Sequence, residues 1–110
     1  MINELFLTLC LSTSLPCADI SVRTYEFNKR EQKEAMAYMT KSGKMGVLLD
    51  DSTLRYSENK IKGLLVHELA HMVVWHTRPY DGGHGHKYTV ICRKLALEAG
   101  VSPNNCKPMI

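Results

Sequence analysis

The sequence predicts an α+β domain in which a small, mostly antiparallel sheet packs on one helix. Three observations predict this class. A chain of 110 residues is long enough for one hydrophobic core. Apolar and polar residues alternate, as in a β-strand, ahead of a segment with the pattern of a β-hairpin, and the apolar residues of the second half recur with helical spacing. The hydrophobic fraction of 45% and the charged fraction of 23% exclude wholesale disorder. We expect a single domain spanning residues 1–110.

The chain is predicted to begin with a helix and a strand. Residues 2–10 place apolar side chains at helical i, i+3 and i+4 spacing. This helix should end near Pro16, because proline disfavours helical geometry in the residue before it. Residues 20–27 alternate apolar and polar side chains, which is typical of a half-buried strand.

A β-hairpin is predicted next, with arms at residues 35–40 and 45–50 and Gly43 in the turn. The second arm is almost entirely apolar, which indicates a strand covered on both faces. An alternative is that residues 45–49 form an edge strand beside a cleft, to which an extended peptide could add through backbone hydrogen bonds.

Two helices are predicted in the second half. The first begins after Ser57, a suitable N-cap, and ends before Pro79. The second ends at Gly100. The apolar stripe of the first helix comprises Ile61, Leu64, Leu65, Met72 and Trp75, and that of the second comprises Tyr88, Ile91, Cys92, Leu95, Ala96 and Ala99.

The four cysteines could form two disulfides, which only an oxidising compartment would favour, so the N-terminus decides the expected location. The apolar run of residues 5–11 is short and Glu4 precedes it where a secretory signal carries a basic residue. No run approaches the roughly 18 apolar residues of a membrane span, so we expect no membrane association. We therefore expect a cytoplasmic protein with reduced thiols. The cysteines, none in a CxxC pair, are Cys10, Cys17, Cys92 and Cys106.

The motif His67-Glu68-Leu69-Ala70-His71 carries the chemistry. Residues four apart return to nearly the same helical face, so both imidazoles can reach one ion while Glu68 stays beside them. Zinc held by neutral nitrogens acidifies a water, and a nearby carboxylate can take its proton. The alternative is that His67 and His71 are ordinary polar residues of a surface helix.

Three histidines compete to be the third ligand. His76 follows His67 by nine residues, which places it on the opposite face of a continuing helix, where it suits the C-terminal end. His84 and His86 both follow a Gly-Gly turn that could bring the chain back over the motif. His84, between two glycines, is favoured because the backbone there bends freely.

The segment from Gly63 to Leu97 resembles the SprT-like zinc metallopeptidases, which include the Spartan proteases that digest proteins crosslinked to DNA. The match comprises the HExxH helix and a His-Gly-x-x-aromatic element, here His84 to Tyr88. The resemblance implies a zincin-like fold, Zn²⁺ held by His67, His71 and His84, and Glu68 as the catalytic base. Tyr88 then has either a packing or a catalytic role.

The chain departs from the family pattern at Lys87, where members often carry an acidic residue before the aromatic one. His86 is also unusual, either as a competing ligand or as a group that supports the ligands. Tyr80 could donate to a developing oxyanion, or it could only pack beside Pro79. No CxxC pair is present, so we expect a minimal version of the domain without the zinc ribbon of larger relatives.

The sequence therefore predicts a zinc metalloendopeptidase that hydrolyses peptide bonds of a protein or peptide by a metal-activated water, with Glu68 as general base. One alternative is a zinc-stabilised binding module without turnover. Another is a DNA-associated accessory protein. The net charge of +3 is modest, although basic residues are available at Lys29, Arg30, Lys41, Lys44, Lys60 and Lys62.

Overall fold

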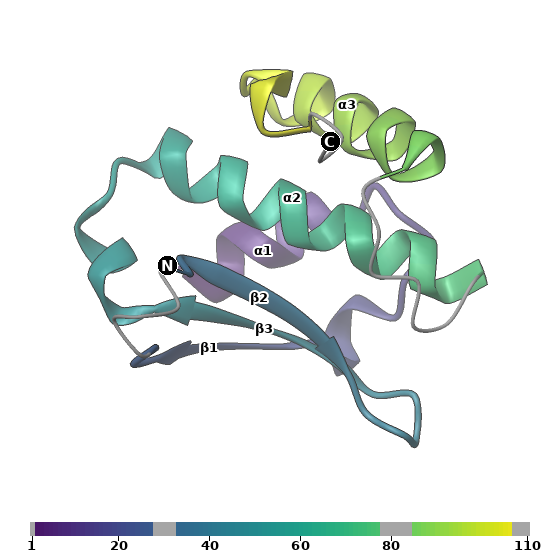
Figure 1. Ribbon diagram of the computed structural model, residues 1–110, viewed down its shortest axis with the longest axis horizontal. Coiled ribbons are helices and arrows are strands. Elements are labelled where there is room, and N and C mark those ends of the chain that lie inside the picture. Colours follow the sequence, from purple (N-terminus) through teal and green to yellow (C-terminus); the bar gives the residue numbers. More distant parts are fainter. Residues whose placement is uncertain (1, 28–32, 78–84, 107–110) are drawn as a thin grey trace.

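Helix α2 (Glu58–Thr77) runs through the middle of the molecule, between the sheet and helix α3 (Figure 1). The structure is a computed structural model that describes residues 2–27, 33–77 and 85–106. The α+β class is confirmed, and the sheet lies against the helix that carries the histidine motif. The other elements are α1 (Ile2–Cys10), β1 (Ser21–Tyr25), β2 (Ala35–Met39), β3 (Met45–Asp50) and α3 (His86–Ala99).

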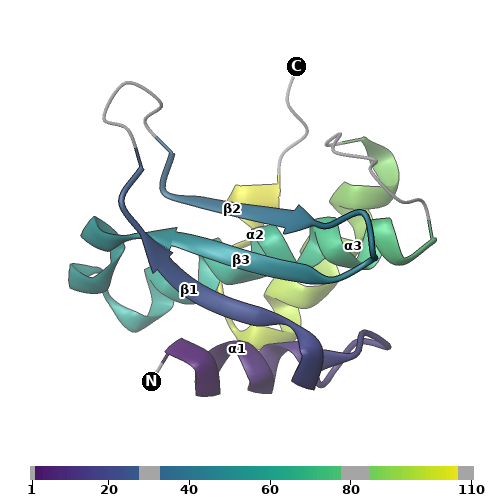
Figure 2. The same ribbon diagram turned by 90° about the horizontal axis from the view of Figure 1, so that it is seen from below.

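The sheet has the order β1-β3-β2 and is mixed (Figure 2). Strand β2 is antiparallel to β3, as a hairpin requires, whereas β1 is parallel to β3. The chain reverses direction between β1 and β2 and again between β2 and β3, so β3 runs parallel to β1. In the sheet, β3 lies between the other two strands. One of the two strand pairs is therefore antiparallel.

Strand β3 is the central strand, so the alternative that residues 45–49 form the edge beside a cleft is wrong. The edge strand next to α2 is β2. Met45, Val47 and Leu49 of β3 are buried in the core. The prediction that β3 is covered by other elements on both of its faces is also wrong for one face. Leu48, on the opposite face, is only half-buried, and no described helix lies over that face (Figure 2).

From Ile61 to Trp75, helix α2 is buried or half-buried on every side, although it carries the polar residues of the motif. Its first turn is capped as predicted, because the Lys60 N–H donates to Ser57 Oγ at 3.3 Å. Helix α3 ends at Gly100, which has the left-handed φ of 73°. None of the described helices is long and apolar enough to cross a membrane. Core residues of α2 include Ile61, Leu65, Val66, Leu69, Ala70, Met72 and Val74.

The four cysteines form two disulfides, so the prediction of reduced thiols is wrong. Cys10, at the end of α1, is bonded to Cys17, and Cys92 of α3 is bonded to Cys106. The two cysteines of each pair are close in sequence, with separations of 7 and 14 residues, and the chain turns back after a helix to join them. Their spacing differs from CxxC, so a search for that motif does not find them. Disulfides persist in oxidising compartments. The cytoplasmic location, which was inferred from the N-terminus, remains a prediction.

Replacing Cys92 and Cys106 together with alanine should lower the free energy of unfolding by about 3 kcal/mol. The reason is that this cross-link, with a sequence separation of 14, restricts the unfolded chain. Urea unfolding of the oxidised wild type and the double variant measures the difference. Equal free energies of unfolding, or free thiols at these positions in the oxidised protein, would contradict the assignment.

Candidate metal centre

The two motif histidines lie one turn apart on α2 and face the same side. Their ring centroids are 5.2 Å apart, and His67 is half-buried whereas His71 is buried. Helix α2 is therefore not the surface helix that the alternative assumed, whereas metal binding by the two histidines stays a prediction. Two neighbouring imidazoles are a donor set that suits zinc, so the residues present fit the predicted metal.

Glu68 is buried between α2 and the edge strand. Its carboxylate accepts a hydrogen bond from the backbone N–H of Ala37 in β2. Burial raises the pKa of Glu68 to about 7, and the Ala37 hydrogen bond and the charge of Lys33 only partly oppose this shift. The raised pKa makes Glu68 a better proton acceptor than an ordinary glutamate at neutral pH.

Tyr88 of α3 contacts both histidines. Its hydroxyl lies 2.7 Å from His67 Nδ1, and its ring stacks on the His71 ring with centroids 4.5 Å apart. Tyr88 is only 2% exposed, and burial raises the pKa of its phenol. Trp75 is also buried, and its ring stacks on His71 at 6.0 Å.

A cleft runs between β2 and the motif. One part, of about 330 Å³, is lined by His67, Glu68, His71 and Trp75 from α2, opposite residues 33 and 35–37. A second part, of about 280 Å³, continues past Glu68 toward Gly63 and Leu64 of the same helix. The catalytic glutamate of the predicted mechanism therefore lies where the two parts meet.

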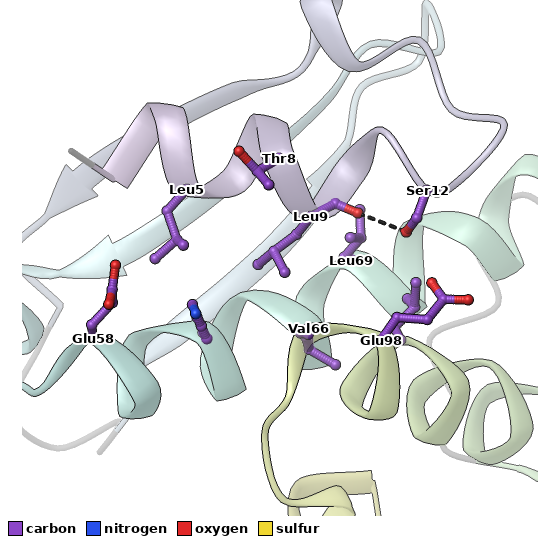
Figure 3. Close-up of a pocket in the computed structure, with 11 residues that line it drawn as sticks. Leu5, Thr8, Leu9, Ser12, Glu58, Val66, Leu69 and Glu98 are labelled. Carbon is purple, nitrogen blue, oxygen red and sulfur yellow. Dashed lines mark hydrogen bonds between the residues drawn. The ribbon is translucent and has the colours of Figure 1, made fainter.

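A separate cavity of about 320 Å³ lies between α1, α2 and α3, and its lining includes Leu69 of the motif but neither His67, Glu68 nor His71. Leu5 and Leu9 of α1 line it opposite Val66 of α2, and Glu58 and Glu98 stand at its margin (Figure 3). The cavity is largely apolar and lacks the imidazoles, so the predicted chemistry belongs to the cleft at β2.

The other predicted site residues lie partly within and partly outside the described residues. His76 is exposed in the last turn of α2, as predicted, and His86 is exposed at the start of α3. His84 and Tyr80 lie outside the described residues, so the third ligand remains a prediction. Within residues 2–27, 33–77 and 85–106, no three histidine, cysteine, aspartate or glutamate side chains gather around one point.

Sequence reasoning missed two contacts with the motif. The Ala37 N–H and the Lys33 charge act on Glu68, but neither residue carries a motif that points to them. The signal that could have indicated Ala37 is the hairpin itself, because every second residue of an edge strand directs its N–H away from the sheet.

A comparison with family models matches residues 10–107 to the SprT-like family. No curated protein and no solved structure was found to match the chain. The match spans the histidine motif, the edge strand and helix α3, so it includes every described element of the cleft.

Replacing Glu68 with glutamine should stabilise the metal-free protein, and more so at pH 8 than at pH 5. The folded-state pKa of about 7 lies above the ordinary 4.5, so the folded protein binds the proton more tightly and wild-type stability falls as pH rises through 7. The loss between pH 5 and pH 8 is about 2–3 kcal/mol, and the neutral amide avoids it. Chelator-treated proteins compared by urea unfolding at both pH values measure it. A stability difference that does not change with pH would contradict the assignment.

Proposed function

The chain belongs to the SprT-like family, and on that basis we propose that it is a zinc-dependent metallopeptidase. The observation that carries the proposal is the pairing of two imidazoles on one face of α2 with a buried glutamate between them and the edge strand. We propose His67, His71 and His84 as the zinc ligands. Helix α3 begins two residues after His84 and contacts both other histidines through Tyr88, which supports this choice.

The proposed reaction is hydrolysis of a peptide bond. Zinc, when bound, supplies a Lewis acid that polarises the peptide carbonyl and acidifies the attacking water. Glu68 accepts a proton from that water as its oxygen attacks the carbonyl carbon, and then gives the proton to the leaving amine. The Ala37 N–H holds the carboxylate at the cleft, and burial keeps it basic enough for this exchange.

The proposed substrate is a protein or peptide segment in extended conformation beside β2. Ala35, Met36 and Ala37 of this strand line the cleft, and the small side chains of the two alanines leave room next to α2. An extended chain can add to such an edge by backbone hydrogen bonds. Binding by backbone hydrogen bonds requires no particular side chain in the substrate. We therefore propose an extended conformation of the substrate and no preferred amino-acid sequence. Binding to DNA remains an expectation from the basic residues alone.

Replacing Glu68 with glutamine should leave zinc binding intact and lower hydrolysis at least a hundredfold, because metal binding and proton transfer belong to different residues. Zinc content by elemental analysis and cleavage of an unfolded protein substrate measure the two effects. Full activity of this variant would remove Glu68 from the mechanism.

The matched controls are His84→Ala and His86→Ala. Loss of zinc is expected in the first and not in the second, and the reverse result would reassign the third ligand. Stoichiometric zinc in the wild type without hydrolysis of folded, unfolded or DNA-bound substrates would favour the zinc-stabilised binding module.

Backbone methylation of a peptide substrate tests the role of β2. In an extended peptide, alternate N–H groups face the same side. Methylating the amides that face β2 should lower kcat/KM about tenfold or more, whereas methylating the intervening amides should have a small effect. Two series of singly methylated peptides around one cleavage site measure this. Equal losses in both series would contradict addition to the edge strand.

A further inference from the structure

Tyr88 of α3 contacts both imidazoles of α2. Its hydroxyl lies 2.7 Å from His67 Nδ1 and 3.4 Å from the carbonyl oxygen of the same residue. Its ring stacks on His71 with an interplanar angle of 29°. One residue of α3 thus contacts both predicted ligands contributed by α2.

The donors and acceptors of Tyr88 and His67 indicate which group donates the hydrogen bond between the phenol oxygen and Nδ1. A carbonyl oxygen can only accept, and a phenol has one proton to donate. When the Tyr88 hydroxyl donates to the His67 carbonyl, its oxygen is left to accept from Nδ1–H of the imidazole. A neutral imidazole protonated at Nδ1 has its lone pair on Nε2. That nitrogen is then available to a cation.

We propose that Tyr88 is a positioning residue that sets the tautomer and ring orientation of His67 and, by stacking, the ring orientation of His71. The inference rests on the proposed zinc site. Histidines that bind metals generally donate their second N–H to a fixed acceptor, which orients the ring. Here the acceptor would be a phenol oxygen.

Burial separates this role from a direct catalytic role. Tyr88 is 2% exposed and does not line the cleft between β2 and the motif, whereas His67 and His71 do. Its neighbours one to two turns along α3, Cys92 and Leu95, are also buried, and Cys92 is covalently joined to Cys106. The phenol therefore projects from a helix face that is fixed at a second point.

The test compares zinc affinity in the wild type, Tyr88→Phe and Tyr38→Phe. The first substitution removes the hydroxyl and keeps the stacked ring. The second removes a half-buried tyrosine hydroxyl that is bonded to Ser21 Oγ, away from the motif. Competition with a chromophoric chelator should give a zinc Kd about 10–100-fold higher for Tyr88→Phe. It should give an unchanged Kd for Tyr38→Phe.

A zinc Kd of Tyr88→Phe within twofold of the wild type would overturn the inference and leave the proposed function standing. A wild type that binds no zinc would instead overturn the proposed function. If Tyr88→Phe does not fold, nitrogen NMR of the zinc-loaded wild type decides. A proton on Nδ1 of His67 with the metal on Nε2 is expected, and the metal on Nδ1 would overturn the inference.

Discussion

The enclosure of α2 is the constraint on which the rest of the structure depends. Leu65, Leu69 and Met72 are fully buried, and the helix is covered by the sheet on one side and by α1 and α3 on others. A polar side chain on such a helix loses its water, and without a new hydrogen bond this costs about 1–3 kcal/mol. The motif must therefore obtain partners from the elements packed on α2. Two such partners are the Ala37 N–H for Glu68 and the Tyr88 hydroxyl for His67.

The same enclosure explains why the edge strand lies next to the motif. A central strand such as β3 uses its backbone groups for both neighbours. Strand β2 pairs only with β3 and can direct alternate N–H groups toward α2. Alanines at positions 35 and 37 allow the strand to approach the helix closely enough for the Glu68 contact. A larger side chain here would fill the cleft that the two elements form.

The sequence predicts the parts of the fold that obey local rules. Helical periodicity, the Ser57 cap, the Gly43 turn and the Gly100 stop depend on near neighbours, and the structure confirms each of them. The strand order, the disulfide pairs and the contacts of Tyr88 depend on residues distant in sequence or on chain direction after a turn. Tyr88 and His67 are 21 residues apart, and no spacing rule connects them. The assignment of His84 as third ligand follows from the family resemblance and from its two flanking glycines, both of which are properties of the sequence.

The two helices contribute differently to a metal site. Helix α2 carries the two proposed ligands His67 and His71 at fixed spacing, so their relative position is built into one rigid element. Ring rotation about the side-chain bonds is not fixed by the helix, and it is this freedom that contacts from α3 remove. Ordering the rings before the metal arrives means that binding need not provide the ordering entropy. In the proposed site, the disulfide between Cys92 and Cys106 would influence the histidines indirectly, because it restrains the helix that carries Tyr88. In this arrangement, loosening the C-terminal segment would lower metal affinity without altering a single ligand.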